Sequence, residues 1–284
     1  MTDSPPAASG ASPASAPGHP HVRFERREGR YVVVKTGRRV DLRREARALT
    51  GLGSTAVELI DIVEIDATAA ELITGRVLPG DDLRPLARVD DDTATRIVAE
   101  LITAMRIGQN AEADATSPLP RLDGVLEPLR RCRDPRLPAA LRDAALRLGE
   151  ELVSSPDECV LHGDLQHRNI ARQVHGDAHQ WKVIDPHGWL GDACFETVAV
   201  LVAPESLLLG SDVIDARGMS GAPLVRRTRR RIDIIAEVTG DDRDRVFAWA
   251  LAGAVIAEAR MLDEYDLVHG APLALAQTLA RRPH

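Results

Sequence analysis

Apolar side chains alternate with polar ones at the start of the regular part of the chain, over residues 22–26. A Glu-Gly turn separates this stretch from residues 31–35, which are rich in β-branched side chains. The pattern predicts a β-hairpin whose second strand ends at Lys35. Residues 57–63 and 69–74 have the same β-rich character and predict two further strands.

In much of the remaining chain, apolar residues recur at the spacing of an α-helix. Apolar residues recur every three or four positions over residues 42–49 and again over residues 93–105, where a cluster of Asp precedes the first turn. Such spacing predicts amphipathic helices. The same pattern, complete or partial, predicts further helices at residues 122–129, 137–152, 201–209, 231–237 and 243–262. Propensity by itself therefore indicates mixed α and β structure.

Two short apolar runs in the middle of the chain lead directly into oxygen-bearing side chains. Residues 159–161 precede the string H-G-D-x-x-x-x-N, which carries Asp164 and Asn169, and residues 181–184 precede Asp185. The stretch before the second run is polar, contains a glycine and is typical of a hairpin turn. We therefore expect two strands that deliver these three side chains to one edge of a sheet.

This set of side chains suits phosphoryl transfer. One carboxylate, here Asp164, receives or orients the proton of the attacking hydroxyl. An amide oxygen, from Asn169, and a second carboxylate, from Asp185, hold the metal ions between the phosphates, and Mg²⁺ prefers such oxygen ligands. A single Asp, taken alone, would more often cap a helix, so the prediction rests on the joint pattern and its spacing.

The chain resembles the aminoglycoside/hydroxyurea antibiotic-resistance kinases, and within them the streptomycin 6-phosphotransferase branch. The general resemblance lies in the H-G-D-x-x-x-x-N string and in the later I-D-P. The narrower one lies in residues 184–192, which are similar to the branch's run I-D-P-K-G-x-x-G-[DE], and in the pair Phe195-Glu196. His187 stands where that run usually has Lys. Further similarity extends over residues 31–266.

The resemblance implies an α+β, protein-kinase-like bilobal fold. Residues 1–20, rich in Pro, Ala, Ser and Gly, are expected to be a flexible tail. Residues 21–78 would form a small β-rich nucleotide-binding lobe, and residues 79–284 a larger helical lobe for catalysis and substrate. Kinases of this kind carry a glycine-rich phosphate loop ahead of the strand lysine, and no such loop is recognisable before Lys35. We therefore expect an abbreviated N-terminal lobe.

ATP and Mg²⁺ are the cofactors that the resemblance implies. Lys35 would hold the phosphates with Glu45 as its helix partner, and the backbone of a hinge near residues 75–80 would meet the adenine. Without the downstream motif, Lys35 would be an ordinary solvated lysine and the hinge a Gly/Pro turn. The residues expected around the adenine are Thr74, Arg76 and Val77.

A cationic aminoglycoside requires carboxylates around it. Asp192 and Glu196 match acidic positions that follow the metal-binding strand in the resembling branch, and Trp189 is placed to stack on a sugar or a guanidinium. Each has an alternative: a helix cap for Asp192, a solvated surface for Glu196 and packing within the lobe for Trp189. Weaker candidates for the same opening are Glu205, Asp212, Asp215, Asp263 and Glu264.

Composition narrows the class of protein. The 284 residues carry a net charge of −7, which argues against a nucleic-acid binder and suits a cationic small substrate. We expect the basic cluster at residues 226–231 to be a solvated face. No apolar run approaches the length of a membrane span, and the first residues lack the features of a signal peptide, so we expect a cytoplasmic protein that binds no membrane.

We therefore expect an ATP-dependent phosphotransferase that moves the γ-phosphoryl group to a hydroxyl of an aminoglycoside-like small molecule of the streptomycin type. Hydroxyurea or another small hydroxyl compound is the alternative acceptor. The missing glycine-rich loop favours a third alternative, a degenerate kinase that binds a ligand without turnover. His162, His167 and His187 fit no zinc motif. The sequence leaves the oligomeric state and the choice between ATP and GTP open.

Overall fold

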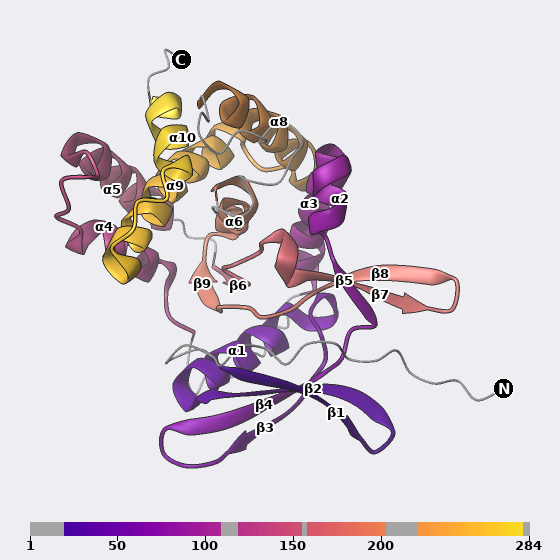
Figure 1. The fold of residues 1–284 in the computed structure, drawn as a ribbon. Helices are drawn as coiled ribbons and strands as arrows, with labels where there is room; N and C mark the ends of the chain where they lie inside the picture. Colours follow the sequence, from indigo (N-terminus) through magenta and orange to yellow (C-terminus); the bar gives the residue numbers. More distant parts are fainter. Residues whose placement is uncertain (1–19, 109–118, 155–157, 203–220, 281–284) are drawn as a thin grey trace.

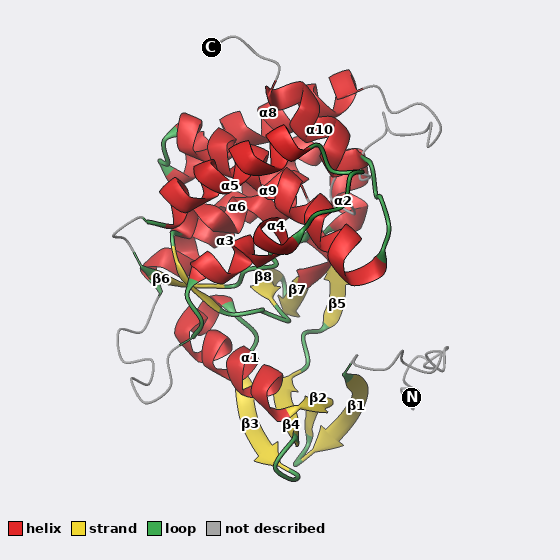
Figure 2. Ribbon diagram, turned by 90° about the vertical axis from the view of Figure 1, so that its left-hand side faces the viewer, coloured by secondary structure: helices red, strands yellow, loops and turns green. Residues whose placement is uncertain are grey.

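The computed structural model describes residues 20–108, 119–154, 158–202 and 221–280. A β-sheet with one long helix forms the N-terminal end, and a group of helices forms the opposite end (Figures 1 and 2). Smaller strands lie between these two parts. The predicted flexible tail, residues 1–20, falls outside the described residues except for Pro20.

The N-terminal sheet has four antiparallel strands in the order β1-β2-β4-β3. They are β1 (His21–Arg27), β2 (Arg30–Arg38), β3 (Leu59–Glu64) and β4 (Ala69–Gly75). The predicted hairpin and the two further strands are therefore present. Val32, Val34 and Ile73 form a small cluster of their own, whereas Leu72, next to Ile73 and thus on the other face, belongs to the main core.

Helix α1 (Arg39–Leu52) follows β2 directly and is longer than the predicted helix at residues 42–49. Its buried residues include Leu42, Ala46 and Leu49, which recur at helical spacing and pack into the main core. Lys35 is paired with Leu72 across β2 and β4, so its side chain leaves the sheet on the face that joins this core. Glu45 of α1 meets Lys35 on that side.

The chain leaves the N-terminal sheet at Gly75 and reaches a second sheet at Pro79. There β5 (Pro79–Asp82) pairs with β7 (Ile170–His175), and β7 pairs with β8 (Ala178–Val183). The hairpin turn expected before Asp185 joins β7 to β8. Strands β5 and β7 themselves were not predicted.

Strand β6 (Cys159–Leu161) does not join this sheet but pairs with β9 (Trp189–Gly191). The expectation that the two strands leading to the site share one sheet edge is therefore wrong. The chain reverses after β8 at Asp185 and Gly188, whose φ angles are 58° and 70°, and this reversal brings β9 back to β6. A hydrogen bond of 2.9 Å from Ile184 N–H to Asn169 O still joins the two loops.

The C-terminal part is mostly helical (Figure 2). The predicted helices at residues 93–105, 137–152, 231–237 and 243–262 are present, and the one predicted at 201–209 extends beyond the described residues. The helices are α2 (Arg84–Val89), α3 (Asp91–Ile107), α4 (Glu127–Arg131), α5 (Ala139–Val153), α6 (Thr197–Val202), α8 (Gly221–Thr239), α9 (Arg243–Tyr265) and α10 (Ala271–Ala280). The 3₁₀ turns are η1 (Gly53–Thr55), η2 (Leu122–Leu126), η3 (His167–Asn169) and η4 (Ala193–Glu196). No helix among the described residues is both long and apolar enough to cross a membrane.

The basic cluster expected as a solvated face lies on α8. Arg231 is buried and pairs with Asp91 of α3 at 2.5 Å, and Arg227 is buried as well. The expectation is therefore wrong for these two arginines. Arg230 is exposed and pairs with Asp92. Part of the cluster thus fastens α8 to the acidic start of α3.

One hydrophobic core runs from α1 through the small strands to α10. Close packing of α1 on β6 shows how tightly the two ends of the molecule are joined: a Cβ added at Gly51 would lie 2.8 Å from Val160 Cγ2. The N-terminal and C-terminal lobes therefore share buried apolar surface around the junction where the predicted site residues lie.

Candidate active site

Strand β6 runs into a loop that is held from within by His162. This side chain is fully buried; its Nε2 donates to Ile184 O at 2.9 Å, and its Nδ1 accepts the N–H of Asp164 at 3.2 Å. One donating and one accepting ring nitrogen require the neutral imidazole. Burial favours the same form because it lowers the pKa of His162 to about 4. The backbone at Asp164 is thereby fixed to the strand that precedes Asp185.

The carboxylate of Asp164 is oriented by two neighbouring amides. Gln166 Nε2 donates to its Oδ1 at 2.6 Å, and Asn169 Nδ2 donates to its Oδ2 at 3.0 Å and to its backbone oxygen at 2.8 Å. Both bonds of Asn169 use the nitrogen, so the amide oxygen is the atom that suits a metal ion. His187, in the position of the resembling branch's Lys, places Nε2 4.0 Å from Asp164 Oδ2.

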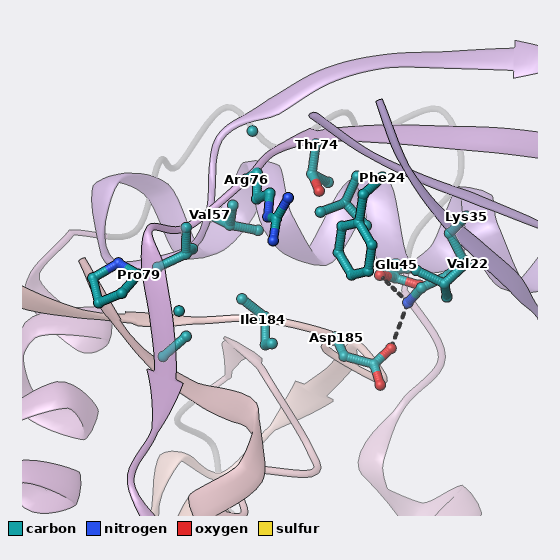
Figure 3. Close-up of a pocket in the computed structure, with 15 residues that line it drawn as sticks. Val22, Phe24, Lys35, Glu45, Val57, Thr74, Arg76, Pro79, Ile184 and Asp185 are labelled. Carbon is teal, nitrogen blue, oxygen red and sulfur yellow. Dashed lines mark hydrogen bonds and ion pairs between the residues drawn. The ribbon is translucent and has the colours of Figure 1, made fainter. Parts of the chain in front are cut away.

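Lys35 connects the N-terminal lobe to this loop region. Its Nζ lies 2.6 and 2.8 Å from the two carboxylate oxygens of Glu45 and 2.5 Å from Asp185 Oδ1 (Figure 3). Burial opposes the charge of Lys35, but the two carboxylates outweigh it and raise the pKa of Lys35. Burial likewise opposes ionisation of Asp185, and the ammonium of Lys35 outweighs it and lowers the pKa of Asp185. The predicted ion pair between Lys35 and Glu45 is therefore formed.

A cavity of about 360 Å³ lies between the lobes and contains these three charged side chains at one end. Thr74, Arg76 and Val77 line it, as expected for the hinge, and Figure 3 shows Thr74 and Arg76 beside Phe24. The volume falls within the range of small-molecule sites. The described structure thus gathers all five residues predicted to bind the nucleotide around one opening.

Sequence reasoning missed the apolar lining of this cavity. The alternation in β1 puts Val22 and Phe24 on one face, and this signal could have identified them. Arg76 lies over the Phe24 ring, with its guanidinium carbon 4.5 Å from the ring centroid. Between Pro20 and Lys35 the structure contains only the β1–β2 hairpin and no glycine-rich loop. The further apolar lining residues are Val33, Val57, Ala171 and Ile184.

The residues present fit a magnesium ion. Asp185 offers a carboxylate and Asn169 an amide oxygen, the hard donors that Mg²⁺ prefers. A protein commonly supplies only one or two carboxylates to Mg²⁺, and phosphates and water complete the coordination. Among the described residues, no group of three or more His, Cys, Asp or Glu side chains is placed to hold a metal ion without such help.

Asp192, predicted to contact the substrate, is engaged by the protein itself. Its Oδ2 accepts hydrogen bonds from Arg245 at 2.7 Å and from Trp249 Nε1 at 2.6 Å, and its Oδ1 accepts the N–H of Cys194 at 3.0 Å. Only 7% of the residue is exposed. The prediction is corrected: Asp192 caps the turn η4 and anchors α9, in agreement with the helix-cap alternative.

Glu196 is also buried, which contradicts both the predicted substrate contact and its solvated alternative. Its carboxylate accepts the backbone N–H groups of His162 and Gly163, the latter at 3.1 Å. Burial raises the pKa of Glu196 to about 7. The side chain supports the loop of Asp164 from inside the lobe.

Trp189 packs directly on the same loop. A Cβ added at Gly163, where φ is 77°, would lie 2.4 Å from Trp189 Cδ1, so only glycine fits there. The guanidinium carbon of Arg44 lies 4.1 Å from the centroid of the Trp189 ring. Trp189 also lines a second cavity, of about 140 Å³, together with Asp164.

Of the weaker acidic candidates, Glu205, Asp212 and Asp215 lie outside the described residues.

Known proteins resemble the chain in sequence and in fold. It is 30% identical over 199 residues to streptomycin 3''-kinase of Klebsiella pneumoniae, with 68% of this chain and 67% of the relative covered. It is 28% identical over 199 residues to hydroxyurea phosphotransferase of Kitasatospora aureofaciens, with 69% of this chain and only 52% of the relative covered. Its fold is similar to a thermostable mutant of aminoglycoside phosphotransferase APH(4)-Ia in complex with AMP-PNP and hygromycin B, with a TM-score of 0.62, 14% identity and coverage of 94% of this chain and 92% of the other.

The fold is thus the protein-kinase-like fold expected from the sequence, with a β-rich N-terminal lobe and a helical C-terminal lobe. The sequence model of one family, described as aminoglycoside/hydroxyurea antibiotic resistance kinase, matches residues 17–264. This match spans most of the 284 residues. The chain therefore belongs to the aminoglycoside/hydroxyurea antibiotic resistance kinase family.

Proposed function

We propose that this protein transfers the γ-phosphoryl group of ATP to a hydroxyl of a small-molecule antibiotic. Two observations carry the proposal: Asp185 lies beside the Lys35–Glu45 ion pair at one end of the 360 Å³ cavity, and Asp164 is hydrogen-bonded to Asn169 in a loop that is joined to Ile184, the residue before Asp185. A degenerate kinase is less well supported, because the side chains proposed for phosphoryl transfer include a candidate base, two oxygen donors for a metal ion and a lysine paired with a glutamate.

Each residue has a defined task in this proposal. Asp164 accepts the proton of the acceptor hydroxyl. At the same time the oxygen of that hydroxyl forms a bond to the γ-phosphorus, and the bond between the γ-phosphorus and the β,γ-bridging oxygen breaks. Lys35, held by Glu45, binds the phosphates. Asp185 and Asn169 would hold Mg²⁺, which would supply positive charge to stabilise the phosphates.

The remaining nucleotide contacts belong to the N-terminal lobe. We assign residues 21–78 to nucleotide binding, with the adenine between the hinge backbone near Val77 and the apolar wall that includes Phe24. The stack of Arg76 on Phe24 would close the opening that a glycine-rich loop covers in other kinases. Residues 79–284 then carry catalysis and acceptor binding.

The acceptor has two candidates from the relatives. Streptomycin is named for one group of relatives and hydroxyurea for another. A streptomycin-type acceptor is cationic and needs free carboxylates, but Asp192 and Glu196 are bonded within the protein. Within the described part of the chain, their engagement favours the second candidate, a small hydroxyl compound without several positive charges.

The test is phosphoryl transfer by purified protein with γ-labelled ATP and Mg²⁺, using streptomycin and hydroxyurea as acceptors. Asp164→Asn should lower the rate of transfer by about 10²–10⁴ because the base is lost, while nucleotide binding and the melting temperature stay close to wild type. Arg243→Gln, on the exposed start of α9, is the control. Full activity of Asp164→Asn would rule out its assigned role.

A further inference from the structure

The second cavity is lined by Asp164, the proposed base. Its volume is about 140 Å³, and Trp189, α6 and α9 form much of its wall. Among the described residues that line it, Asp164 and Arg260 are the charged ones and Gln166 is the other polar one. The remaining lining is apolar or glycine, and includes Val198, Ile256 and Met261.

Arg260 presents a cation to this apolar space. It lies on α9, and its Nε is 3.9 Å from Glu264 Oε1, beyond hydrogen-bonding distance. Both side chains are partly exposed, 41% for Arg260 and 49% for Glu264, so solvent screens the pair. A guanidinium has five N–H donors in a planar fork. Arg260 therefore keeps donors for a ligand in the cavity.

A second guanidinium, that of Arg44, packs on Trp189, which lines the cavity. Arg44 covers one face of Trp189 and donates through Nε to Gly188 O at 2.8 Å. The face of Trp189 that Arg44 covers is closed to a guanidinium of a ligand. Arg44 also adds positive charge on this side of the loop, which disfavours a cationic acceptor.

Among the described residues, three carboxylates that were candidates for a cationic acceptor are bonded within the protein. Asp192 pairs with Arg245, and Glu196 accepts backbone N–H groups. Asp263, just beyond Leu262 on α9, pairs with Arg131 at 2.7 Å. Within the described part of the chain, Asp164 is the one acidic residue that lines the cavity.

We propose that the acceptor is a small hydroxyl compound with a compact apolar body and a carboxylate or other hydrogen-bond-accepting oxygen that binds Arg260. This inference rests on the proposed kinase function and specifies its acceptor. The hydroxyl lies at Asp164, the apolar body against Val198, Ile256 and Met261, and the accepting oxygen at the guanidinium of Arg260. An arginine fork recognises a carboxylate through two parallel hydrogen bonds.

Three alcohols of nearly equal size test the charge preference: para-(hydroxymethyl)benzoate, para-(hydroxymethyl)benzamide and para-(aminomethyl)benzyl alcohol. Phosphoryl transfer from labelled ATP is measured for each, with streptomycin and hydroxyurea alongside, and binding of each is measured by calorimetry. We expect the benzoate to exceed the aminomethyl compound by at least about tenfold in kcat/KM and in affinity, since one charge-assisted contact is gained. Preference for the aminomethyl compound or for streptomycin would overturn the inference.

Variants of α9 assign the preference to one side chain. Arg260→Gln should raise the KM for the benzoate by about tenfold and leave that for the benzamide nearly unchanged, while Arg260→Lys should retain part of the preference. Arg243→Gln, which removes an exposed arginine from the first turn of the same helix, should change neither value. An unaltered order of the three alcohols in Arg260→Gln would contradict the role of Arg260.

The same experiment separates this inference from the kinase proposal. If none of the five compounds is phosphorylated, the kinase proposal fails, and calorimetry decides the inference by itself. Binding of the benzoate that is lost in Arg260→Gln would still support the anion-accepting cavity. Equal binding of the benzoate and the aminomethyl compound would overturn it, whatever the transfer assay shows.

Discussion

Two buried titratable residues, His162 and Glu196, set the position of the loop that carries Asp164. His162 is held neutral between Ile184 O and the N–H of Asp164, and Glu196 receives two backbone N–H groups. Burial shifts their pKa values in opposite directions, to about 4 for His162 and to about 7 for Glu196. The loop is thus stabilised differently by each residue as the pH changes.

The pH dependence of stability should reveal the buried carboxyl of Glu196. Its folded pKa, about 7, lies above the ordinary value of 4.5 for a glutamate, so the folded state binds more protons between these values and loses stability as the pH rises through them. Glu196→Gln lacks this titration. The unfolding free energy of wild type minus that of the variant should therefore fall by about 3 kcal/mol from pH 4.5 to pH 7.

Urea unfolding of both proteins across this pH range gives the difference directly. His162 has the opposite pH dependence, because its lowered pKa removes stability as the pH falls, but it is present in both proteins and cancels. The amide of Gln has one oxygen, so Glu196→Gln also loses one of the two hydrogen bonds from backbone N–H groups. This loss changes the unfolding free energy of the variant by a constant amount at every pH. The control is Glu237→Gln, which makes the same change in net charge at an exposed position. A constant difference would show that Glu196 does not titrate in this window.

At the scale of elements, the ion pairs that join α3 and α8 include two of very different burial. The side chain of Arg231 is 1% exposed and pairs with Asp91, whereas that of Arg230 is 62% exposed and pairs with Asp92. If Arg231 is removed, the side chain of Asp91, 20% exposed, has little water to replace its partner. If Arg230 is removed, the side chain of Asp92 is 49% exposed and water replaces the arginine. Neighbouring arginines on one helix should therefore contribute very differently to stability.

Truncation of each arginine to methionine tests this difference. Arg231→Met leaves Asp91 without its partner and should lower the free energy of unfolding by roughly 3–5 kcal/mol. Arg230→Met should lower it by at most about 1 kcal/mol. Urea titrations of the two variants measure both values. Similar losses in the two proteins would contradict the assignment of α8 as a helix fastened mainly by Arg231.

At the scale of the whole molecule, one hydrophobic core joins the lobes around the nucleotide cavity. Lys35 and Glu45 come from the N-terminal lobe and Asp185 from the C-terminal lobe, and their contacts cross the junction. A ligand bound there interacts with both lobes at once. It should therefore stabilise the molecule as a unit.

Nucleotide binding should raise the melting temperature of the protein in a magnesium-dependent way. At a ligand concentration of 100 times Kd, the stabilisation is about 2.7 kcal/mol. Asp185→Ala should lose the magnesium-dependent part of the shift, because this carboxylate is proposed to hold the ion. Thermal unfolding with ATP, with and without Mg²⁺, measures the effect, and Asp164→Asn is the matched control that keeps it. A wild-type response of Asp185→Ala would make Asp185 a structural residue.

The sequence by itself determined the parts of the molecule that depend on neighbouring residues. The β1–β2 hairpin, the amphipathic helix with Glu45 and the loop with Asp164 and Asn169 are each formed by one continuous short segment of the chain, so local periodicity and spacing define them. The ion pair of Lys35 with Glu45 follows because a strand leads directly into that helix. The resemblance to a family then supplied the arrangement of lobes.

Only the tertiary structure decided what the acidic residues after Asp185 do. Asp192 is bonded to Arg245 and Trp249, more than fifty positions away, and Glu196 faces backbone N–H groups over thirty positions before it. Whether a carboxylate meets solvent, a ligand or an internal donor depends on which distant segments pack against it. The spacing of residues along the chain does not show which distant segments pack together. The pairing of β6 with β9 was missed for the same physical reason.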